Sequence, residues 1–188
     1  MRLPLIPPAD LTPEQRSLYE TMREGIASNF NLFLVEAPDG ALMGPWNPWL
    51  HEPKIGRAIW DLTMAMTANA TLPDNVRQIA ILAVGARFDA AYEIYAHIAV
   101  AEHEGMSAAR LATLTADLKP ADLSLEESVG FDVAFALVRG GTLPEPLYRL
   151  GVAIFGQHGM NELIYLVGLY SLVSVTLNAY NVPVPERE

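Results

Sequence analysis

The chain has 188 residues, 51% of them apolar, which is enough for one folded domain with a sizeable core. Its 22 acidic residues outnumber its 12 Lys and Arg residues, and the net charge of −10 argues against nucleic acid or an anionic membrane as a partner. The absence of cysteine excludes disulfides, thiolate metal sites and thiol peroxidase chemistry.

Glycine and proline divide the sequence into blocks with helical spacing of apolar residues, and no segment alternates as a strand would. We therefore predict an all-α fold, a single-domain helical bundle of about seven or eight helices. An extended arm at 1–11 and a long loop at 29–52 are expected to flank the first helix. The predicted helices are 13–28, 53–69, 74–88, 90–104, 107–118, 124–139, 144–157 and 161–180.

Local signals mark several helix ends. Capping boxes begin at Thr12 and at Ser124, each with a Gln or Glu three residues later. We expect Asp89 to cap the helix that follows it and His158-Gly159 to form a turn before the last helix.

The last predicted helix contains the longest apolar stretch, at 163–177. This stretch is shorter than the roughly 20 residues of a membrane span, so we interpret it as a buried helix or a subunit interface. We expect a soluble, cytoplasmic protein that forms homo-oligomers.

Glu93 and His97 are the most distinctive pair in the sequence. They lie four residues apart, so on a helix both side chains share one face. A carboxylate in that position can hydrogen-bond the imidazole and fix its tautomer, which is the basis of an acid–base pair. The same spacing also occurs in purely structural ion pairs, and with two more ligands, such as His51 or His103, it would suit a metal.

The order of motifs resembles the carboxymuconolactone decarboxylase family, which includes the alkylhydroperoxidase D branch. The central stretch at 72–105 reads LPDNVRQIAILAVGARFDAAYEIYAHIAVAEHEG. Further similarity lies at 123–127, 155–163 and 177–183, so that the resemblance covers roughly residues 12–185.

The resemblance implies an alkylhydroperoxidase D-like fold, no cofactor and no metal, and assembly as trimers or hexamers. His97 matches the family histidine, whereas Glu93 and Ala90 occupy the two cysteine positions of the peroxidase branch. The chain therefore looks like a Cys-free member. Gln78 stands where the family has a glutamate, and because glutamine cannot ionise, a relay through that position is in question.

The activity that the resemblance implies is loss of CO₂ from a small lactone acid. Such a reaction needs a cation for the carboxylate, a donor near the carbonyl oxygen and an acid that returns a proton to carbon. The expected acid is His97, oriented by Glu93. The other candidates are Arg77 and Arg87 as anchors, Tyr92 or Tyr95 as donor, and Trp46 and Trp49 as the wall for a flat ring. The arginines also suit surface ion pairs, and the aromatic residues also suit packing.

Two rival functions stay open at this stage. One is a helical oligomer of the same family that binds a ligand or partner without turnover. The other is a metal-dependent enzyme built on His97 and Glu93. A cofactor-free lyase or isomerase-type enzyme is the leading hypothesis.

Overall fold

The computed structural model describes residues 1–185 and confirms the predicted all-α class. These residues form eight α-helices and one short 3₁₀ turn, with no β-strand beyond an isolated bridge between Glu36 and Leu42. The elements are η1 (Pro8–Asp10), α1 (Pro13–Asn29), α2 (Trp46–His51), α3 (Pro53–Ala68), α4 (Asp74–Arg87), α5 (Ala91–His103), α6 (Ala108–Thr115), α7 (Leu125–Val138) and α8 (Glu145–Tyr180).

Both predicted capping boxes are present. Thr12 accepts a hydrogen bond from the backbone of Gln15 at the start of α1, and Ser124 accepts one from Glu127 at the start of α7. In each case the side chain of the second residue accepts a hydrogen bond from the cap backbone, so two otherwise free N–H groups are satisfied.

Three local predictions were wrong. The predicted loop at 29–52 contains α2, whose six residues are too few to show a helical period. Asp89 does not cap α5, because its backbone is left-handed (φ 51°) and the cap position falls on Ala90. The break before the last helix lies at Gly156 (φ 68°) rather than at His158-Gly159, and α8 consists of two helical segments that meet there.

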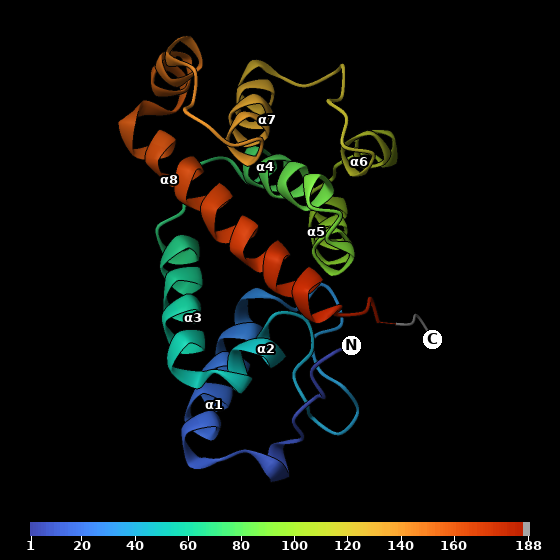
Figure 1. The fold of residues 1–188 in the computed structure, drawn as a ribbon. Helices are drawn as coiled ribbons and strands as arrows, with labels where there is room; N and C mark the ends of the chain where they lie inside the picture. The colour runs from blue at the N-terminus through green and yellow to red at the C-terminus, as the bar shows by residue number, and fades with distance from the viewer. Residues whose placement is uncertain (186–188) are drawn as a thin grey trace.

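Helix α8 runs diagonally between the two halves of the molecule (Figure 1). On one side, buried residues of α4, α7 and α8 form the larger apolar core. On the other side, α1, α2, the first turns of α5 and the end of α8 enclose a second core. Helix α8 is also long and apolar enough to cross a membrane by length and composition alone, two properties that core helices share.

The first residues tie the end of α8 to α2. The backbone N–H of Arg2 donates to the carbonyl oxygen of Tyr180 at 2.7 Å. The carbonyl oxygen of Pro4 receives the amide of Asn47 at 3.1 Å and lies 2.9 Å from Nε2 of His51. Residues 1–7 contain no helix or strand, and these contacts connect them to both α2 and the end of α8.

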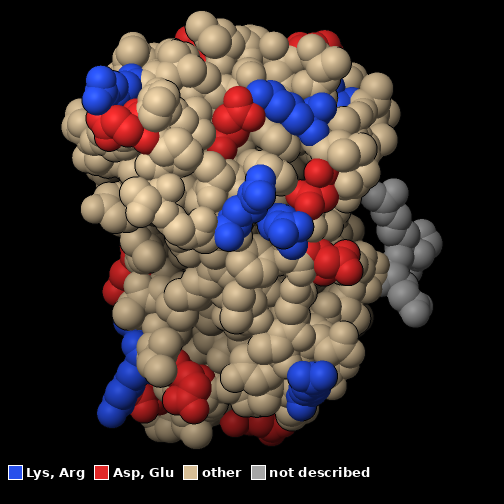
Figure 2. All heavy atoms as spheres, turned by 45° about the horizontal axis from the view of Figure 1, so that its top comes forward, with Lys and Arg blue, Asp and Glu red and all other residues tan. Residues whose placement is uncertain are grey.

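On one face of the molecule, charged side chains of both signs are intermixed (Figure 2). On the face shown in Figure 2, acidic and basic groups lie beside one another and are separated by wide uncharged areas. Lys119 forms an ion pair with Asp132 (2.7 Å), and Arg110 forms one with Asp122 (2.9 Å).

Candidate functional site

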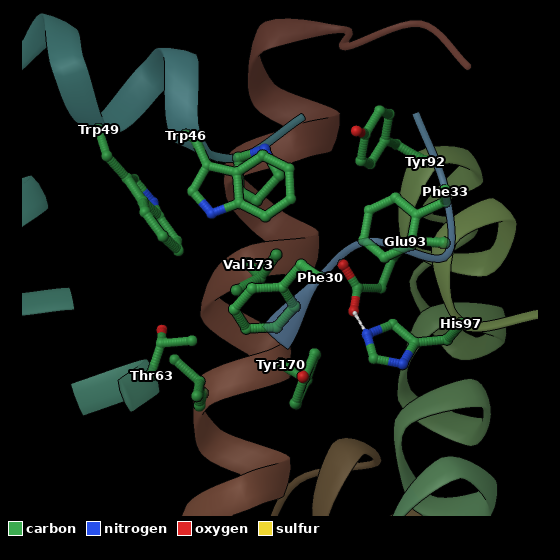
Figure 3. Close-up of a pocket in the computed structure, with 13 residues that line it drawn as sticks. Phe30, Phe33, Trp46, Trp49, Thr63, Tyr92, Glu93, His97, Tyr170 and Val173 are labelled. Atoms are coloured by element: carbon green, nitrogen blue, oxygen red, sulfur yellow. Dashed lines mark ion pairs between the residues drawn. The ribbon is translucent and has the colours of Figure 1, made fainter. Parts of the chain in front are cut away.

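A small cavity lies in the second core, between α2, α5 and α8. Its volume of about 40 Å³ is space for roughly three water molecules. Figure 3 shows the tryptophans of α2 on one side and Glu93 and His97 of α5 on the other, with α8 behind. The lining residues are Phe30, Phe33, Pro45, Trp46, Trp49, Thr63, Tyr92, Glu93, Ala96, His97, Leu169, Tyr170 and Val173.

Glu93 and His97 meet at this cavity. One helical turn separates them on α5, and Nε2 of His97 lies 3.0 Å from Oε1 of Glu93. Both residues are buried, with 4% and 9% of their surface exposed. Little water reaches the pair, so its electrostatic interaction is screened weakly.

Gln78 of α4 approaches the other nitrogen of His97. Its Oε1 lies 2.8 Å from Nδ1 of the imidazole, and the residue is itself buried. Gln78 does not line the cavity; it stands behind the histidine. Each ring nitrogen of His97 therefore has one polar neighbour, and the ring orientation is fixed from two helices.

Two polar atoms at the cavity are buried without a hydrogen-bond partner among residues 1–185: Oε1 of Glu93 and Nε1 of Trp49. The carboxylate oxygen is within ion-pair distance of His97 but takes part in no hydrogen bond with the described residues. A buried donor or acceptor without a partner costs about 1–3 kcal/mol. Trp49 and Glu93 both line the cavity, so its walls contain one donor and one acceptor without a partner.

Close backbone approaches place the tryptophans. Gly56 of α3 lies against Trp49, and a Cβ atom added there would stand 2.2 Å from the carbonyl oxygen of Trp49. Gly44 (φ 60°) lies against the ring of Tyr92 in the same way. Trp46 also stacks on Phe33, with ring centroids 6.2 Å apart.

Tyr92 and Tyr95 hold the segment before α2. The hydroxyl of Tyr92 donates to the carbonyl oxygen of Leu34 at 3.0 Å, and the N–H of Leu34 donates to the hydroxyl of Tyr95 at 3.1 Å. Burial raises the pKa of Tyr92 above its ordinary value, so its hydroxyl stays a donor. Because that donor is engaged, the predicted role of Tyr92 as a donor to substrate has no support in this geometry, although its ring lines the cavity.

The structure does not bring Arg77 or Arg87 to the cavity. Arg77 forms a buried ion pair with Glu162, which also accepts hydrogen bonds from Thr71 and Leu72. Burial alone would raise the pKa of Glu162, but these hydrogen bonds and Arg77 outweigh it and lower the pKa. Arg87 pairs with Asp117 at 3.3 Å on the surface. Arg87 thus follows the surface ion-pair alternative, whereas the ion pair of Arg77 is buried.

Sequence reasoning missed several lining residues. Tyr170 stands edge-on to the imidazole of His97, with ring centroids 5.0 Å apart. Burial, together with the charge of Glu93, raises the pKa of Tyr170, so this hydroxyl is also neutral. The long apolar stretch of α8 at 163–177 gave no sign of which face would meet His97. Phe30, Phe33, Thr63, Leu169 and Val173 were missed as well.

The histidines proposed as further metal ligands do not join the pair. His51 contacts Pro4 and does not line the cavity, and His103 is exposed at the end of α5. Within residues 1–185, no three His, Asp or Glu side chains gather in a metal-binding arrangement.

Comparison with known proteins adds no relative. No protein-family model matches the chain, and a search of curated proteins finds no match.

Proposed function

We propose that this protein is a cofactor-free lyase or isomerase-type enzyme of the carboxymuconolactone decarboxylase type. It acts on a small cyclic lactone or acid by proton transfer through His97. The observation that carries the proposal is the buried pair of His97 and Glu93 at the cavity, with Gln78 fixing the far side of the imidazole.

The proposed chemistry moves one proton and one electron pair. When a C–H or C–CO₂⁻ bond beside the conjugated system breaks, its electron pair spreads into the ring carbonyl. The indole N–H of Trp49 is the available donor for the oxygen on which charge develops. In decarboxylation CO₂ leaves, and His97 delivers a proton to carbon and regains one from water. In isomerisation His97 takes the proton of the C–H bond and returns it to another carbon of the same conjugated system. Gln78 and Glu93 flank the imidazole in both cases.

The proposal is tested with two lactones and two histidine variants. CO₂ release from γ-carboxymuconolactone reports decarboxylation, and isomerisation of the uncharged α-angelica lactone reports proton transfer without CO₂ loss. We expect His97→Ala to lower turnover of at least one substrate by about 10²–10⁴-fold. His103→Ala, on the exposed end of the same helix, should keep wild-type rates. Absence of turnover of both lactones by a folded sample, or wild-type rates in His97→Ala, overturns the proposal.

A ligand-binding protein without turnover is the second candidate. Gln78 favours it, because an amide can orient His97 but cannot ionise as the family glutamate does. Such a protein would bind small ring compounds with nearly equal affinity in the wild type and in His97→Ala.

We also propose that the protein assembles with copies of itself through α8. Tyr165, Leu172 and Val175 are 64%, 40% and 53% exposed, and with Gly168 they follow a spacing of three and four residues along one face. No charged residue occurs at 163–180, so two copies can bury this face against each other without burying a charge. Light scattering at micromolar concentration should give the mass of an oligomer, and a monomer contradicts the proposal.

A further inference from the structure

We infer that the cavity beside His97 accepts an uncharged monocyclic compound with a carbonyl group and excludes the corresponding carboxylate. The inference rests on the proposed function and names the substrate class of that same site. It departs from the carboxylic acid that the family resemblance suggests.

The cavity has one acidic residue in its wall, Glu93, and no Arg or Lys among the lining residues within 1–185 to balance it. The two arginines that could have held a substrate carboxylate are engaged with Glu162 and Asp117. A substrate carboxylate would therefore lose its hydration beside a like charge, and only His97 could offset that cost.

Two buried polar atoms of the lining residues have no hydrogen-bond partner among residues 1–185. The indole N–H of Trp49 needs an acceptor, and Oε1 of Glu93 needs a donor. A neutral carbonyl compound supplies the acceptor, and an N–H or O–H group on the same ring supplies the donor. A carboxylate supplies acceptors alone, so it would leave the oxygen of Glu93 without a partner.

The walls and the volume of the cavity limit the shape and size of the ligand. Trp46, Phe30 and Phe33 present aromatic rings, and Val173 of α8 lies beside Phe30 in the view of Figure 3. A flat ring gains most from such walls. A volume of about 40 Å³ is far below the roughly 300 Å³ at which drug-sized pockets begin. One ring is therefore the upper limit, and it enters only if Phe30 and Phe33 move, both of which belong to the irregular segment before α2.

The test compares benzamide with benzoate, two ligands of nearly equal shape, at pH 7.5. Binding is measured by calorimetry and by tryptophan fluorescence, since Trp46 and Trp49 line the site. We expect benzamide to bind the wild type at least about 10-fold more tightly than benzoate. In Glu93→Gln, the affinity for benzoate should rise about 10-fold, while that for benzamide changes less than about 3-fold.

Glu102→Gln is the matched control, because it removes one acidic charge from the exposed end of α5 and should leave both affinities unchanged. The wild-type comparison needs no variant, so it stands if Glu93→Gln fails to fold. Equal or tighter binding of benzoate, or no binding of either ligand at millimolar concentration, overturns the inference. His97-dependent turnover of γ-carboxymuconolactone, without turnover of α-angelica lactone, would support the proposed function and still overturn the inference.

Discussion

Gln78 and His97 face each other across α4 and α5, with Oε1 of the amide 2.8 Å from Nδ1 of the imidazole. This contact gives the two nitrogens of the imidazole different surroundings. Gln78 orients Nδ1 from behind, and Nε2 is left to the side where Glu93 and the cavity lie. An amide in this place can orient the imidazole without exchanging a proton with it.

The first prediction concerns that amide. Gln78→Glu places a carboxylate beside Nδ1, which stabilises the protonated imidazole, so the basic limb of the pH profile of kcat/KM should move to higher pH. Gln78→Leu should lower kcat about 10-fold, because the ring loses its partner. NMR titration of the imidazole checks the same shift independently of turnover. Gln157→Glu, an exposed change on α8, is the control, and an identical shift there would contradict a role for Gln78.

A second prediction concerns Glu162 and acid stability. The pKa of Glu162 is lower in the folded protein than its ordinary value of 4.5. Its contribution to the free energy of unfolding is therefore complete above about pH 4.5 and is lost as the pH falls through the folded-state pKa. Glu162→Gln leaves Arg77 buried without its partner and should cost about 3 kcal/mol at pH 7.

Urea unfolding of wild type and Glu162→Gln from pH 7 to pH 3 provides the measurement. The difference in free energy of unfolding between the two proteins should become smaller as the pH falls. A difference in free energy of unfolding that stays constant over this range would show that the charge of Glu162 does not stabilise the fold.

The third prediction concerns Gly56. In Gly56→Ala the added methyl group meets the backbone oxygen of Trp49, which no side-chain rotation relieves. We expect a loss of about 3 kcal/mol in thermal or urea unfolding, with a change in tryptophan fluorescence as α2 shifts. Gly85→Ala is the matched control: its methyl group makes ordinary contacts of 3.5 Å with Glu93 and Ile94, so stability should be equal or higher. Equal losses in both variants would contradict the packing argument.

The two tryptophans of α2 yield a fourth prediction. Trp49→Phe removes the buried N–H that has no partner, and kcat/KM should fall about 10²-fold. Trp46→Phe makes the same exchange on the same helix but leaves that N–H in place. Its kcat/KM should fall less than about 10-fold. Similar losses in the two variants would mean that ring packing, rather than the indole donor, supports turnover.

The fifth prediction concerns the exposed face of α8. Val175→Glu adds a charge to that face and should shift the mass in light scattering toward the monomer. Leu125→Glu is the control, since Leu125 is 66% exposed at the start of α7 and belongs to a different helix. Dissociation in both variants would point to a different interface.

Local features of the fold could be predicted from the sequence, and long-range contacts could not. The helix starts at Thr12 and Ser124 depend on side chains three residues away, and the pairing of Glu93 with His97 depends on one helical turn. The contact of Gln78 with His97 requires the packing of two helices.

Long-range contacts also explain why Arg77 does not line the cavity. The sequence identified Arg77 as a candidate anchor, but its partner Glu162 lies 85 residues further along the chain. Periodicity indicates that a helix has a buried face, but it does not say which residue lies opposite. Tyr170 was missed for the same reason, because nearly every face of the last helix reads as apolar.

The arm at residues 1–7 gives the cavity a remote reporter. Pro4 holds Asn47 and His51 of α2, the helix that carries both tryptophans, while Arg2 holds the end of α8. A ligand in the cavity would contact Trp46 and Trp49, and the arm binds the same helix, α2. Binding of the ligand and docking of the arm therefore favour each other by linkage. Protease cleavage near Pro4 should slow when the cavity fills, and a bulky fusion ahead of Met1 should weaken binding at a site that it never touches.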